Sequence, residues 1–145
     1  MSTALELYDG PVPTTDILTR WYEEEKDFNY GAYIPFVGTI RDESGISALS
    51  FDIYEPILQA WFDAWQEKAK KRGAKLKMAH SRVDVPLHTS SYVSAVFSPK
   101  RRVALEMIDE FVEDFKASAP IWKYDVIDGE RIYAADRSTA LNGSG

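Results

Sequence analysis

The sequence predicts an α+β domain with a mostly antiparallel sheet and about three helices. Two observations carry this prediction. Segments with the composition of β-strands are mixed with segments of helical periodicity, and the two kinds do not alternate strictly along the chain. The connections between strand-like segments also vary in length, whereas a parallel sheet needs a long crossover between successive strands.

The first two predicted helices follow capping signals. Thr14 or Thr15 is expected to cap the first helix with its hydroxyl. Pro56 suits the first turn of the second helix, and Gly73 ends it after a basic last turn. The apolar sides consist of Ile17, Leu18, Trp21 and Tyr22 in the first helix, and of Leu58, Trp61, Phe62, Trp65 and Ala69 in the second.

A third, longer helix is predicted between two prolines. Ser98 is expected to be its cap and Pro99 its first helical residue. Pro120 ends the helix, because a residue before proline avoids the helical conformation. The predicted inward stripe is Leu105, Ile108, Phe111, Val112 and Phe115.

The strand-like segments lie between these helices. Pro35 marks the first of them as an edge or bulged strand. Asp128-Gly129 predicts a tight turn within the last, which reads as a hairpin. The predicted segments are 31–40, 47–54, 75–83, 91–97 and 126–134.

Composition indicates one globular domain and excludes several kinds of site. A chain of 145 residues with 45% hydrophobic residues fits a single domain, expected at 1–140 with a flexible tail at 141–145. The absence of cysteine excludes disulfides, thiolate metal sites and cysteine nucleophiles. Two histidines are too few for a usual histidine metal site, so we expect no metal and no cofactor.

Charge and hydropathy restrict the partners and the location. Seventeen basic and 23 acidic residues give a net charge of −6, which opposes nucleic-acid binding. No apolar run reaches the roughly 20 residues that span a bilayer. The first six residues do not read as a signal peptide, so we expect a cytoplasmic protein without membrane contact.

Basic residues occupy the first turn of the third predicted helix. Lys100, Arg101 and Arg102 stand where acidic residues are preferred, because a helix N-terminus carries partial positive charge. A bound phosphate would use both these side chains and the free backbone N–H groups. The alternative is a solvated basic turn balanced by Glu106 and Asp109.

Three further cations are candidates for chemistry. Lys116 and Lys123 have apolar and aromatic neighbours that could line a pocket. Such a pocket would lower the pKa of a lysine amine and suit it to proton transfer. Arg41 follows a strand and could clamp a phosphate or carboxylate. The alternatives are ordinary surface lysines and a turn ion pair at Arg41.

Other conspicuous residues read as structural. Trp61 and Trp65 have the helical spacing of core residues, and the acidic run 23–27 reads as a solvated face. His80 and His88 are also interpreted as structural rather than catalytic.

Three segments resemble the large, catalytic subunit of molybdopterin synthase, the MoaE family. Residues 36–42 are similar to that family's F-x-G-x-x-R-D stretch, and residues 51–54 to its L-E-x-Y strand. The most specific match is residues 115–123, F-K-A-S-A-P-I-W-K, which resembles L-K-x-x-A-P-[FIL]-W-K. The resemblance runs from about Gly31 to Tyr133 and implies that family's α/β-hammerhead fold.

The resemblance implies a sulfurtransferase of molybdenum cofactor biosynthesis. Its substrate is cyclic pyranopterin monophosphate, and its product is the dithiolene molybdopterin. The sulfur donor is a small ubiquitin-like subunit whose C-terminal Gly-Gly carries a thiocarboxylate. The family assembles as a heterotetramer, with a central homodimer of large subunits and a small subunit at each end.

The resemblance also assigns roles to residues. Lys116 and Lys123 match the two lysines of the reaction centre. Arg41 and Arg101 match residues that hold the substrate phosphate, with Arg101 acting across the dimer, and Phe36 lines the pocket.

Two positions depart from the family pattern. Lys100 stands where the family has histidine, which keeps a cation but loses a group that titrates near neutrality. The family's C-terminal arginine is either replaced by Asp136 or displaced to Arg137, and Arg137 is therefore a candidate substrate contact. The alternative to an enzyme is a non-catalytic module that binds a ubiquitin-like partner or a phosphorylated metabolite.

Overall fold

The computed structural model describes residues 4–43, 45–134, 138–139 and 143–144. It confirms the α+β class, with three helices and a mostly antiparallel sheet among these residues. The helices are α1 (Thr14–Glu25), α2 (Glu55–Lys71) and α3 (Arg101–Ser118). The strands are β1 (Leu5–Asp9), β2 (Ala32–Thr39), β3 (Ala48–Ile53), β4 (Lys75–Pro86), β5 (Ser90–Ser98), β6 (Ile121–Ile127), β7 (Glu130–Tyr133), β8 (Ser138–Thr139) and β9 (Gly143–Ser144).

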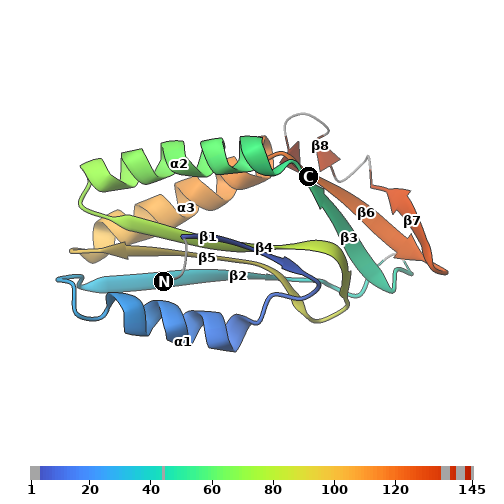
Figure 1. The fold of residues 1–145 in the computed structure, drawn as a ribbon, viewed down its shortest axis with the longest axis horizontal. Helices are drawn as coiled ribbons and strands as arrows, with labels where there is room; N and C mark the ends of the chain where they lie inside the picture. Colours follow the sequence, from blue (N-terminus) through green and yellow to red (C-terminus); the bar gives the residue numbers. More distant parts are fainter. Residues whose placement is uncertain (1–3, 44, 135–137, 140–142, 145) are drawn as a thin grey trace.

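One seven-stranded sheet organises the molecule, in the order β2-β5-β4-β3-β6-β7 with β1 beside β4 (Figure 1). Only the β1–β4 pairing is parallel within this sheet. Strand β4 changes partners along its length, from β5 up to His80 to β3 from Val83 onward. The sheet therefore has a main half around β4 and β5 and an arm made of β3, β6 and β7, and Pro35 lies in an outermost strand as predicted.

The helices cover both faces of the main half. Figure 1 shows α2 and α3 together on one face and α1 on the other. The larger core lies under α2 and α3 and includes Phe62, Met78 and Phe111, and a second lies under α1 around Ile17 and Trp21. No helix in the described part of the chain is both long and apolar enough to cross a bilayer.

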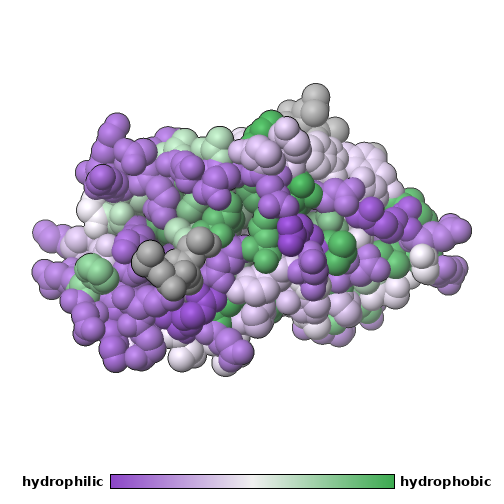
Figure 2. Space-filling view, viewed as in Figure 1, coloured by the Kyte–Doolittle hydropathy of each residue, from purple (hydrophilic) through white to green (hydrophobic). Residues whose placement is uncertain are grey.

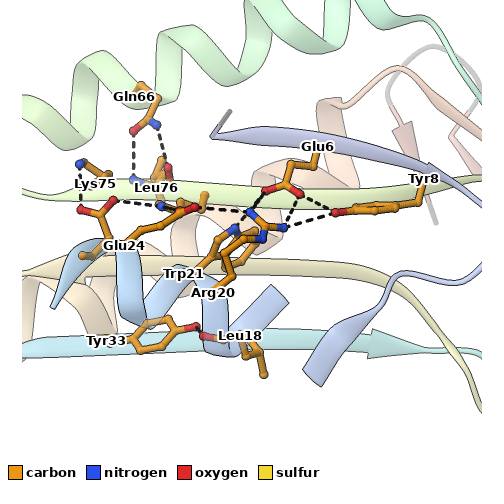
Figure 3. A network of polar contacts seen from close by, with 12 residues as sticks. Glu6, Tyr8, Leu18, Arg20, Trp21, Glu24, Tyr33, Gln66, Lys75 and Leu76 are labelled. Atoms are coloured by element: carbon orange, nitrogen blue, oxygen red, sulfur yellow. Dashed lines mark hydrogen bonds and ion pairs between the residues drawn. The ribbon is translucent and has the colours of Figure 1, made fainter. Parts of the chain in front are cut away.

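Strand β1 was not predicted, and it is held by a polar network with α1 (Figure 3). Arg20 donates two hydrogen bonds to the Glu6 carboxylate, at 2.9 and 2.7 Å. Trp21 donates its indole N–H to the same carboxylate at 3.2 Å, and the Tyr8 hydroxyl donates to it as well. The contacts of Arg20 and Trp21 with Glu6 join residues 14 and 15 positions apart, so the five-residue strand depends on tertiary structure.

The predicted starts of α1 and α3 were wrong in detail. Ser98 is the last residue of β5, because pairing with Ala32 extends through it, and its hydroxyl donates to the carbonyl of Lys100 at 2.6 Å. Helix α3 therefore begins at Arg101. Helix α1 begins at Thr14 without a side-chain cap.

Two burial predictions also need correction. Leu105 is 42% exposed, because α3 turns Ala104 and Met107 toward the core instead. Glu25 is buried rather than solvated, because it pairs with the ammonium group of the buried Lys77 at 3.0 Å. The positions of Trp61 and Trp65 agree with the prediction of a structural role, since both donate their indole N–H to Asp114.

Candidate active site

A pocket of about 520 Å³ lies where the main half of the sheet meets the arm. Its walls come from β2 to β6, the segment after β2, and the C-terminal end of α3. Four predicted site residues line it, namely Phe36, Arg41, Lys116 and Lys123. The other lining residues are Gly38, Thr39, Ile40, Glu43, Leu49, Phe51, His80, Ser91, Tyr92, Val112, Phe115, Ala119 and Ile121. We refer to it as the central pocket.

Lys116 and Lys123 reach the central pocket because the chain reverses between them. Helix α3 ends where Ala119 becomes extended, as the following Pro120 requires. The N–H of Ala119 donates to the carbonyl of Phe115 at 3.1 Å, which closes the last turn of the helix. Strand β6 then begins and carries Lys123 back past the helix end. Lys116 is exposed and Lys123 is half-buried.

The pairing of β6 with β3 fixes the direction of Lys123. Lys123 stands directly opposite Phe51, which is 5% exposed. Residues directly opposite one another in an antiparallel pair share one face of the sheet. The Lys123 side chain therefore starts from the face that forms the floor of the central pocket.

Arg41 lies at the rim of the central pocket, two residues after β2. Its side chain is 80% exposed, and its Nη2 atom lies 3.2 Å from Oε2 of Glu43. The turn ion pair that the sequence left open is therefore present. An exposed pair of this kind contributes at most about 1 kcal/mol, so it does not prevent the guanidinium from turning to an anionic ligand.

Aromatic rings form one wall of the central pocket. The rings of Tyr92 and Phe115 stack with centroids 4.3 Å apart and an interplanar angle of 14°. Phe36 lies 5.9 Å from Tyr92 and is 38% exposed. Flat rings beside cationic side chains suit a ligand that combines a planar ring with negative charge.

His80 lines the central pocket, although sequence reasoning treated it as structural only. Its Nδ1 atom lies 2.7 Å from the carbonyl oxygen of Ser81, and a carbonyl only accepts, so Nδ1 carries the hydrogen. Burial, with a smaller contribution from the nearby charge of Lys123, lowers the pKa of His80 to about 4 against the opposing effect of the Ser81 contact. The alternation along β4 identifies the face of His80, but no sequence signal shows that a pocket opens there.

Lys100 and Arg101 do not line the central pocket of their own chain. They stand at the start of α3, whereas Lys116 is in its last turn. Fifteen residues of helix separate Arg101 from Lys116, which is about 22 Å at 1.5 Å per residue. One chain therefore does not bring these predicted site residues together. Arg137 lies outside the described residues.

The described residues contain no group of three or more His, Asp or Glu side chains that could hold a metal ion. The face seen in Figure 2 is mostly hydrophilic, with hydrophobic residues gathered near its middle. The ionisable and hydroxyl side chains that line the central pocket belong to Thr39, Arg41, Glu43, His80, Ser91, Tyr92, Lys116 and Lys123.

Residues 11–118 match the family described as MoaE protein. The molybdopterin synthase catalytic subunit of Helicobacter pylori (strain ATCC 700392 / 26695) is 48% identical over 97% of this chain and 97% of its own length. The catalytic subunit from strain J99 is 40% identical over the same shares of both chains. The chain belongs to the MoaE family.

Solved structures share the fold of this chain. The MoaE-family chain superposes with a TM-score of 0.93 on a chain of the complex of subunits 1 and 2 of the molybdopterin-converting factor from H. pylori 26695. The two chains are 47% identical, and the match covers 99% of this chain and 98% of that one. Molybdopterin synthase from Staphylococcus aureus shares the fold at a TM-score of 0.78 and 20% identity, with 92% of this chain and 98% of that one covered.

Proposed function

We propose that this chain is the catalytic subunit of a molybdopterin synthase. In this proposal it transfers sulfur from the thiocarboxylated C-terminus of a small ubiquitin-like subunit to cyclic pyranopterin monophosphate. The observation that carries the proposal is the meeting of Lys116 and Lys123 in one pocket, from elements on either side of a chain reversal. The similar H. pylori chain comes from a complex of subunits 1 and 2 of the molybdopterin-converting factor, which supports a second subunit as partner.

The two lysines handle charge and protons during sulfur transfer. As the thiocarboxylate sulfur attacks the pterin side chain, negative charge develops on the reacting groups, and an ammonium group stabilises it or donates a proton. Lys116 is exposed, and the central pocket that it lines is open to solvent. The substrate and the inserted C-terminal tail exclude that water, which strengthens both interactions.

The substrate phosphate is held by Arg41 and by Lys100 and Arg101 from a second copy of the chain. Helix α3 has no acidic residue in its first turn. Its basic side chains and the free backbone N–H groups of that turn are therefore both available to bind one anion. Lys100 supplies an ammonium group there, as a compact positive charge for the phosphate. Arg137 is proposed as a further substrate contact on the family resemblance alone.

The outermost strand β2 offers a route to this shared site. Arg41 follows one end of β2, and the start of α3 lies at the other end, where the N–H of Gly31 donates to the carbonyl of Pro99 at 3.1 Å. If two copies pair antiparallel along β2, the two-fold axis sets each Arg101 beside the partner's pocket rim. A homodimer of this kind forms the centre of the proposed heterotetramer.

A reconstituted reaction tests the function. The purified chain is mixed with a thiocarboxylated small subunit and the pterin precursor, and dithiolene formation is followed. We expect product only when all three components are present. A chain that binds the small subunit but yields no dithiolene would instead be a binding module.

A further inference from the structure

His80 has a hydrogen-bonding atom that the proposed reaction does not yet use. Its side chain is 3% exposed and packs among three rings of the central pocket. The centroids of Phe51, Phe115 and Tyr92 lie 5.0, 5.6 and 5.8 Å from that of His80. These contacts fix the plane of the imidazole ring.

The tautomer of His80 follows from one contact. Nδ1 lies 2.7 Å from the carbonyl oxygen of Ser81, which has no hydrogen to give. The hydrogen of the neutral ring therefore sits on Nδ1, and Nε2 keeps its lone pair. Nε2 is the polar atom that this side chain can offer to the central pocket as an acceptor.

Lys123 and His80 flank the same ring. Phe51 stands directly opposite Lys123 in the β3–β6 pairing, so their side chains leave the sheet on one face. Phe51 also meets His80 edge-on at 5.0 Å. The charge of Lys123 is close enough to act on the imidazole, and burial keeps that imidazole uncharged at neutral pH.

We propose that His80 is a positioning residue, whose Nε2 accepts a hydrogen bond from the ammonium group of Lys123 and directs it into the central pocket. This inference rests on the proposed function. A neutral acceptor suits the role because an imidazolium would repel the ammonium, whereas a carboxylate would neutralise the charge that the reaction needs. The imidazole can hold Lys123 in one direction and leave its charge available to the substrate.

Two substitutions separate this role from packing. His80→Asn keeps a donor near Nδ1 for the Ser81 carbonyl and removes the acceptor at Nε2. His80→Gln can place an amide oxygen near Nε2 and loses the Nδ1 donor. We expect His80→Asn to lower kcat about 10- to 100-fold with KM little changed, as for a lost hydrogen bond to a charged group. We expect His80→Gln to recover most of that loss.

Met107→Ala serves as the control, because Met107 is buried in α3 and does not line the central pocket. It should lower the melting temperature and leave kcat of the folded enzyme unchanged. Equal kcat values for His80→Asn and His80→Gln, whether both normal or both reduced, would overturn the positioning role. If the unsubstituted chain forms no dithiolene at all, the proposed function fails instead.

Nitrogen-15 NMR of the labelled imidazole supplies a readout that does not depend on activity. At pH 7 we expect the chemical shifts of a ring protonated on Nδ1 only. A ring protonated on Nε2, or on both nitrogens, would overturn the proposal because no lone pair would face Lys123. Lys123→Ala should shift the Nε2 resonance of His80, and an unchanged resonance would also contradict the contact.

Discussion

His80 links the stability of this protein to pH. The unfolded chain binds a proton on this histidine near pH 6.5, whereas burial, with a smaller effect of Lys123, lowers the pKa to about 4 in the folded state. The unfolded state therefore gains protons first as the pH falls. The neutral, buried histidine therefore contributes about 3 kcal/mol to the free energy of unfolding above pH 6.5, relative to low pH. This contribution is lost as the pH falls toward 4.

Urea unfolding at pH 7 and pH 4.5 checks this prediction. Carboxylates also titrate in that range, so the informative quantity is the difference between the parent and His80→Asn. We expect the parent to lose more stability than the variant between the two pH values, by about 2 to 3 kcal/mol. The same loss in both proteins would show that His80 is not the group responsible.

Val83 is a branched residue in a left-handed conformation, with a φ of 59°. Such a conformation costs about 1–2 kcal/mol for residues with a Cβ atom, and the side chain is 50% exposed, so packing recovers little. Val83→Gly should raise the free energy of unfolding by up to about 1 kcal/mol. The strain that is relieved exceeds the stability lost through the extra freedom of glycine in the unfolded chain. The control is Val37→Gly, at an exposed valine within β2. This change relieves no strain and should lower the free energy of unfolding.

The junction of β2 and α3 sets where the basic helix start lies. Gly31 approaches the carbonyl of Pro99 so closely that a Cβ atom at this position would collide with backbone. Gly31→Ala should therefore displace the start of α3, destabilise the protein by about 1–3 kcal/mol and raise KM for the phosphorylated substrate. Gly38→Ala is the stability control, because its Cβ would meet Tyr92 at an ordinary 3.5 Å. Equal stability of the two variants would contradict this account.

Elements with strong local signals were predicted well. The segment from Pro56 to Gly73 became α2, and Asp128-Gly129 forms the turn between β6 and β7, with both residues at positive φ. Capping residues, apolar periodicity and turn chemistry act over a few residues, so they can be read without the rest of the fold. Proline at position 120 likewise fixed the end of α3.

Features that depend on distant residues were missed. Strand β1 exists through its pairing with β4 and the contacts of Glu6 with α1. Ser98 reads as a helix cap but is held in β5 by its pairing with Ala32. His80 could be placed on a strand, but its position in a pocket depends on how β3 and β6 meet the main half of the sheet.

Within one chain, the central pocket and the start of α3 lie too far apart to form one complete site. Mixing two inactive variants tests whether two copies share the site. In a dimer of Arg101→Ala with Lys123→Ala, one pocket keeps its lysines and receives the intact Arg101 of the other chain. Random exchange makes half of the dimers mixed, each with one complete site of two, so about a quarter of the parent activity should return.

A site built within one chain predicts a different result. Every mixed dimer would then lack either Arg101 or Lys123 in each pocket, and mixing would restore nothing. Sedimentation of the parent at micromolar concentration supplies the second check. We expect a dimer, and a monomer with full activity would contradict the shared site.

In the proposed function, Lys116 and Lys123 carry out the chemistry in the central pocket. The decisive measurement is single-turnover dithiolene formation by Lys116→Ala and Lys123→Ala, at saturating precursor and thiocarboxylated subunit. Lys71→Ala, an exposed lysine at the end of α2, is the control. We expect each pocket variant to lose at least about 100-fold in rate, as for removal of a proton-transfer group, while the control keeps the parent rate. Full activity in both pocket variants would contradict the account.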